Sequence, residues 1–83
     1  MKREISIIGI IVKNLSAVDT LNNVLHKYSE FIIGRMGLPY KERDINLISI
    51  SVDADVETTN RLKAEIESVP EVIANSVCYD VEF

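Results

Sequence analysis

Basic residues are few and scattered in this chain of 83 residues. It carries 9 Lys and Arg against 13 Asp and Glu, which gives a net charge of -4 and a pI of about 4.8. No cluster of Lys and Arg is longer than a pair. Because neutralisation of phosphates dominates the affinity of proteins for nucleic acids, direct nucleic-acid binding is not expected.

Cysteine and long apolar segments are also scarce. Cys78 is the only cysteine, which excludes a disulfide within the chain and suits a reducing cytoplasm. No segment approaches the roughly 20 apolar residues that a membrane-spanning helix needs. The apolar run at 5–12 is too short for a signal peptide, and no cleavage site of small residues follows it. We therefore expect a cytoplasmic protein that does not enter the membrane.

The motifs of common catalytic and cofactor sites are missing. There is no glycine-rich phosphate loop, no pair of cysteines with metal-ligand spacing, and no nucleophile placed beside a base. We therefore predict neither an enzyme nor a resident cofactor. Gly34 and Gly37 match the G-x-x-G loop of one RNA-binding module, but that loop needs basic neighbours and a helix on each side.

The abundance of apolar residues is unusual for so short a chain. A single domain, residues 1–83, is the only reasonable division, and it would bury about 60–65% of its extended-chain surface. Yet 47% of its residues are hydrophobic. The run at 5–12 is β-branched and apolar on both faces, so both faces should be covered. The chain's own helices can cover one face, and the other requires a second subunit.

Periodicity predicts two helices and three further strands. A helical stripe follows a capping sequence at Ser16 and ends near Phe31. A second stripe follows possible caps at Asp53 and Asp55 and ends before Pro70. Strand patterns occupy 33–40, 45–52 and 72–83, with a charged turn at 41–44.

The order strand, helix, strand, strand, helix, strand predicts an α+β fold. It is the ferredoxin-like βαββαβ sandwich, a four-stranded antiparallel sheet with two helices on one face. The first and third strands should be central and the second and fourth should be edges. Gly34, Gly37 and Pro39 fit an edge strand, where a lost ladder donor costs little.

Two residues near this edge strand suggest a ligand site. The guanidinium of Arg35 could hold a carboxylate or phosphate, or could simply protect the edge from strand pairing. His26, on the flank of the first helix, could contact a ligand or pack at a boundary and pair with Glu30. Tyr28 and Tyr40 fit boundary packing better than ligand stacking. We name His26, Gly34, Arg35, Gly37 and Tyr40 as candidate ligand-binding residues.

An alternative is a metal site shared by two chains. One His26 and one Cys78 per chain could form a two-fold site in a dimer, whereas Cys78 could also be an ordinary strand residue that faces the same side as Ser76 and Asp80. A module that serves only assembly is a third reading.

Residues His26 to Tyr40, read as HKYSEFIIGRMGLPY, together with the opening Arg3-x-Ile5, resemble the family of iron-only hydrogenase system regulators. The resemblance extends over nearly all of the chain. It implies an ACT-like fold related to the regulatory domain of the nickel-responsive repressor, and its recurring residues fall on His26, Arg35, Gly37 and Pro39. That repressor's histidine-rich metal set is absent, so nickel sensing is not expected.

The resemblance also implies how such a module works. ACT-like domains form homodimers or homotetramers, here through the open sheet face and the edge strands, and bind small-molecule effectors between subunits. We expect a transcriptional regulator of an iron-only hydrogenase system that acts through a protein partner, since the chain offers no nucleic-acid surface.

Overall fold

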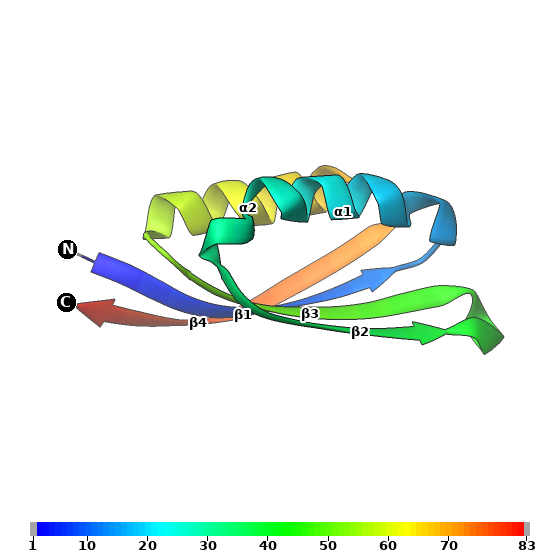
Figure 1. Cartoon of the computed structure of the whole chain (residues 1–83), viewed down its shortest axis with the longest axis horizontal. Helices are drawn as coiled ribbons and strands as arrows, with labels where there is room; N and C mark the ends of the chain where they lie inside the picture. The colour runs from blue at the N-terminus through cyan, green and yellow to red at the C-terminus, as the bar shows by residue number, and fades with distance from the viewer. Residues whose placement is uncertain (1, 83) are drawn as a thin grey trace.

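The computed structural model describes residues 2–82 and has the predicted ferredoxin-like architecture (Figure 1). Its strands and helices, in chain order, are β1 (Lys2–Val12), α1 (Val18–Lys27), β2 (Ile32–Tyr40), β3 (Ile45–Ala54), α2 (Val56–Ser68) and β4 (Val72–Glu82). The sheet order is β2-β3-β1-β4 with every pair antiparallel. The predicted central and edge strands are therefore confirmed.

Both helices lie on the same face of the sheet (Figure 1). This helix-covered face takes alternate residues of each strand, as the pleat requires. The core between the layers is almost entirely aliphatic. Its largest fully buried side chains are Ile8, Ile10, Val12, Leu21, Leu25, Ile50, Val52, Leu62 and Ile66. The helical stripe predicted for the second helix, Thr59, Leu62, Ile66 and Val69, is confirmed at every position.

The ends of α2 also agree with the sequence. The Asp55 carboxylate accepts a hydrogen bond from the Thr58 N–H at 3.0 Å and caps the helix. These hydrogen bonds from Thr58 lower the pKa of the Asp55 carboxyl. At the other end, Val69 is extended before Pro70, as the steric restriction on a residue before proline requires.

The predicted limits of the first helix were wrong at both ends. The cap is Asn14, whose side chain accepts from the Ser16 N–H at 3.0 Å and opens a 3-10 turn, Leu15–Ala17, before α1. The α-helix ends at Lys27, and a second 3-10 turn, Ser29–Phe31, leads into β2. The Tyr28 N–H bonds to the Leu25 carbonyl, a tighter three-residue spacing that ends the α-helical ladder.

No helix within residues 2–82 is long and apolar enough to cross a membrane.

Replacing Leu62 by alanine tests the placement of the core. The side chain is fully buried, so Leu62→Ala should lower the free energy of unfolding by about 2–5 kcal/mol through lost burial and an unfilled cavity. Urea denaturation measures the change. Val56→Ala, at an exposed position of the same helix, should cost less than about 1 kcal/mol. Equal losses in the two variants would contradict this packing.

Candidate functional site

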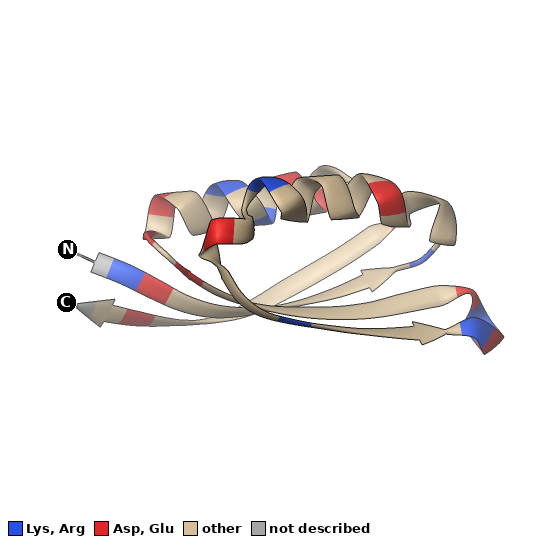
Figure 2. Cartoon of the chain, viewed as in Figure 1, with Lys and Arg blue, Asp and Glu red and all other residues tan. Residues whose placement is uncertain are grey.

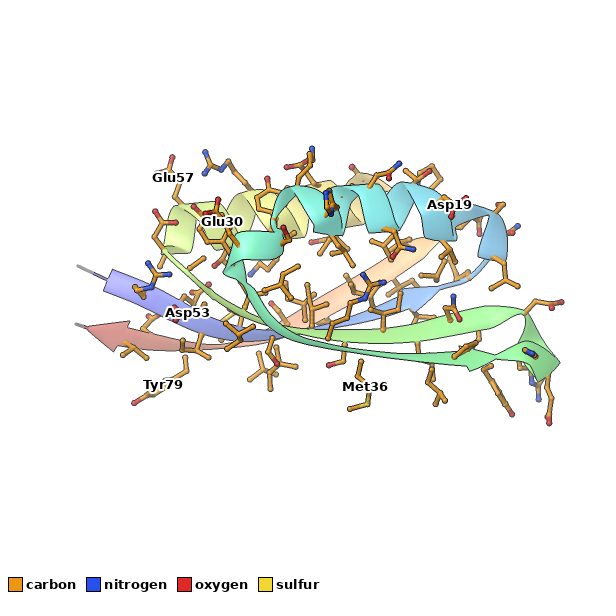
Figure 3. All side chains as sticks on the ribbon, viewed as in Figure 1. Asp19, Glu30, Met36, Asp53, Glu57 and Tyr79 are labelled. Carbon is orange, nitrogen blue, oxygen red and sulfur yellow. The ribbon has the colours of Figure 1, made fainter. Side chains whose placement is uncertain are left out.

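The face of the sheet opposite the helices is apolar and uncovered. We call it the open face. Register pairs Ile5 with Tyr79, Ile7 with Val77 and Ile11 with Ile73, which places these side chains together on this side. Eight large apolar side chains of the open face are exposed, namely Ile7, Ile11, Met36, Leu38, Tyr40, Ile73, Val77 and Tyr79. The labelled Met36 and Tyr79 project away from the helices (Figure 3).

Charges avoid the middle of this sheet. Lys, Arg, Asp and Glu concentrate on the helices, at the turn between β2 and β3 and near the two termini, whereas the centre of the sheet carries almost none (Figure 2). The charged pair that does reach the open face is Arg3 and Asp53, with Nε to Oδ1 at 2.8 Å. The open face is thus an apolar surface with a charged end.

The centre of the open face is hollowed at Gly9. A hollow of about 470 Å³ lies over this glycine, with Ile11, Met36, Leu38 and Ile73 in its walls. A Cβ placed on Gly9 would meet no atom nearer than the Asn75 carbonyl oxygen at 4.0 Å. The protomer itself therefore does not require glycine here, and the free space lies on the outside.

A second hollow lies on the helix-covered side, between α1 and β2. We call it the α1–β2 hollow. It measures about 520 Å³ and is lined by Asn22, Asn23, Leu25, His26, Ser29, Ile32 and Arg35. Leu25 and Ile32 give it apolar walls, and the remaining residues supply a guanidinium, an imidazole, two carboxamides and a hydroxyl. This hollow unites two predicted site residues, His26 and Arg35.

A bulge in β2 determines that Arg35 faces this hollow. The pairing of β2 with β3 shifts between Ile32 and Gly34, so Ile33 is an extra residue and is exposed. Beyond the shift Arg35 pairs with Ile50, a buried residue under the helices. The Arg35 Nη2 donates to the Asn22 Oδ1 at 2.5 Å, which links the edge strand to α1.

The other three candidate ligand residues do not join this group. Gly34 pairs with Ser51 and Tyr40 with Ile45, which places both on the open face, behind Arg35. Gly37 faces the helix side, and a Cβ there would meet no atom within 4 Å. The expectation of one cluster around Arg35 is corrected accordingly, because alternate residues of a strand point to opposite faces.

Cys78 and His26 lie at opposite edges of one protomer. Cys78 is on β4, exposed, and its Sγ accepts a hydrogen bond from the Ser6 hydroxyl at 3.3 Å. It faces the helix side, as its predicted alternation with Val77 and Tyr79 requires. Within residues 2–82 no three His, Cys, Asp or Glu side chains gather in a way that could hold a metal ion. A shared metal site would need a partner chain to bring these residues together.

The carboxylate of Glu65 fixes the end of α1 that carries His26. It accepts hydrogen bonds from the Lys27 ammonium and the Tyr28 hydroxyl, joining α1 to α2. These two bonds lower the pKa of Glu65, and the same carboxylate raises the pKa values of Lys27 and Tyr28. Tyr28 is thus a packing residue, as predicted, and the predicted pairing of His26 with Glu30 is not among the ion pairs of the described residues.

Three polar residues of the α1–β2 hollow were not predicted: Asn22, Asn23 and Ser29. Asn22 and Ser29 are four residues before and three residues after His26. A signal was therefore available, because this spacing places residues on one side of a helical segment.

The family of the chain is evident from a match over residues 4–76 to the family model described as "TM1266-like: Iron-only hydrogenase system regulator, putative". No curated protein sequence matches the chain.

Solved structures share the fold. The uncharacterized protein TM1266 from Thermotoga maritima aligns with a TM-score of 0.86 and 26% identity, over 92% of this chain and 96% of that chain. CPII, a nitrogen regulatory PII-like protein from Thiomonas intermedia K12 bound to ADP, AMP and bicarbonate, aligns with a TM-score of 0.62 and 13% identity, over 100% of this chain and 96% of that one. A protein of Thermus thermophilus described as PII-like and signalling gives a TM-score of 0.58 at 14% identity, over 96% and 90% of the two chains.

The Glu65 contacts predict a pH-dependent contribution to stability. Because the folded state lowers the pKa of Glu65, its contribution should be complete above the ordinary value of 4.5 and disappear as the pH falls through the lower folded value. Glu65→Gln should therefore unfold at a lower urea concentration than the unmodified chain at pH 7, and the two midpoints should converge in acid.

Glu67→Gln is the matched control for this pH series. Glu67 lies on the same helix and has no hydrogen-bond partner for its side chain within residues 2–82. Its midpoint should follow that of the unmodified chain from neutral pH into acid. A gap for Glu65→Gln that stays constant over the whole series would show that lost packing, not lost charge, causes the effect.

Proposed function

The chain belongs to the TM1266-like family of iron-only hydrogenase system regulators, and from this membership we propose that it is a self-associating regulatory module. Its open face is the surface through which two copies join. It is not an enzyme, and its effect on transcription of the hydrogenase system passes through a protein partner. The exposed thiol of Cys78 suits a cytoplasmic setting.

The observation that carries this proposal is the uncovered apolar face of the sheet. Contiguous exposed apolar patches on soluble domains mark interaction surfaces. A ferredoxin-like sheet has helices for one face only, so β1 presents Ile7 and Ile11 to solvent although both faces of that strand are aliphatic. A second sheet packed on the open face would bury these side chains in the way that two sheets of a sandwich do.

The dimensions of the protomer also support a second copy. Its accessible surface is 5453 Å², whereas a monomeric protein of this mass exposes about 5,000 Å². Its radius of gyration is 12.7 Å against about 11.8 Å for a compact domain of this length. The protomer is a thin slab of 43 × 18 × 18 Å, and stacking two slabs sheet to sheet would give an ordinary compact body.

A regulatory module also needs a signal, and we propose that a small effector supplies it. One protein of the same fold, the PII-like CPII, was solved with ADP, AMP and bicarbonate. In this chain the α1–β2 hollow offers polar donors and an apolar wall at the surface. Homodimers paired through the open face leave this hollow free, because it lies on the helix side of β2. Edge strands could extend such dimers to tetramers.

Val77→Lys tests the proposed assembly. Val77 is 75% exposed, so lysine should not disturb the fold of the protomer, but it would place a charge in a dry interface between sheets. The unmodified chain should show a mass of at least twice 9.4 kDa by light scattering at micromolar concentration, and the variant should approach the protomer mass.

Leu15→Lys is the matched control, since Leu15 is also exposed and apolar but lies on the 3-10 turn before α1. It should keep the mass of the unmodified chain. A strictly monomeric unmodified chain would refute assembly, and equal dissociation of both lysine variants would show that the open face is not the interface.

A further inference from the structure

We propose that the α1–β2 hollow binds a small organic anion, with the Arg35 guanidinium on the carboxylate or phosphate group and the apolar body of the ligand against Leu25 and Ile32. The inference rests on the proposed regulatory role, for which it supplies the chemical class of the effector. It concerns the helix side of β2 and not the open face.

The state of Arg35 is the first argument. The Asn22 carboxamide holds one guanidinium nitrogen at 2.5 Å, and an amide oxygen orients the group without neutralising its charge. Arg3 is different, because the Asp53 carboxylate lies 2.8 Å from its Nε. Arg35 therefore presents an oriented, uncompensated positive charge, and a guanidinium has enough N–H groups to hold an anion as well as Asn22.

The lining of the hollow is the second argument. It contains no carboxylate, although the chain has 13 Asp and Glu in all. The acids nearest along this segment, Asp19 in the first turn of α1 and Glu30 beyond its end, lie toward opposite ends of the helix (Figure 3). An anion in the hollow would meet a cation and neutral hydrogen-bonding groups, and no like charge in the lining.

The shape and the apolar residues narrow the class of ligand. A hollow of about 520 Å³ is larger than an inorganic anion needs, and Leu25 and Ile32 would gain nothing from a fully hydrated ion. His26 and Ser29 lie beside them and can accept or donate hydrogen bonds to a polar substituent. The fitting ligand has one anionic group and a short apolar body.

Benzoate, phenyl phosphate and neutral benzamide are suitable probes. Each can be titrated into the isotope-labelled full chain at low ionic strength, with amide NMR signals as the readout. We expect saturable shifts at Asn22, His26 and Arg35 with one or both anions and none with benzamide. The tighter of the two anions identifies the source of the negative charge as carboxylate or phosphate.

Substitutions at Arg35 assign the binding. Arg35 is exposed, so Arg35→Gln should fold normally and weaken anion binding at least about tenfold, whereas Arg35→Lys should retain part of it. Arg43→Gln removes an arginine from the turn after β2 and should leave binding unchanged. The inference is overturned if benzamide binds like benzoate, if none of the probes binds, or if Arg35→Gln binds as tightly as the unmodified chain.

The outcome is separable from that of the assembly test. Val77→Lys should bind the anion as the unmodified chain does, because the hollow is built within one protomer. Arg35→Gln should keep the unmodified mass by light scattering. Binding in a monomeric chain would refute the assembly and preserve this site, and assembly without anion binding would do the reverse.

Discussion

Everything in this structure depends on a shortage of helices. Two helices can cover one face of a four-stranded sheet, and a chain of 83 residues has no further segment for the other face. The hydrophobic effect does not distinguish between the two faces of β1, where isoleucine dominates both. One face becomes the core of the protomer, and the other becomes a surface whose stability in water calls for another sheet.

This constraint divides the function of β2 between its two sides. Arg35 faces the helices and Asn22, whereas Met36 and Leu38 border the hollow over Gly9 on the open face. The proposed effector site and the proposed assembly surface therefore share a single edge strand. The ACT-like and PII-like folds place regulation at such surfaces, and here a single strand lies against both.

Contacts between the two helices keep the effector side in place. Glu65 on α2 holds Lys27 and Tyr28 at the end of α1, directly after His26. Without this connection the end of α1 would depend only on the packing of Leu21 and Leu25 against the sheet. The position of the histidine beside Arg35 is thus set by a carboxylate on the other helix.

The sequence by itself determined the order of the elements, the central and edge strands, the second helix with its Asp55 cap, and the surplus of apolar surface on β1. These follow from periodicity and local hydrogen bonding, which act over a few residues. Only the tertiary structure decided which candidate residues meet. The bulge at Ile33 reverses the alternation of β2, so Arg35 joins His26 while Gly34 and Tyr40 turn to the open face. It also placed Cys78 and His26 at opposite edges, because strand pairing joins residues that are distant in the chain and local patterns do not encode it.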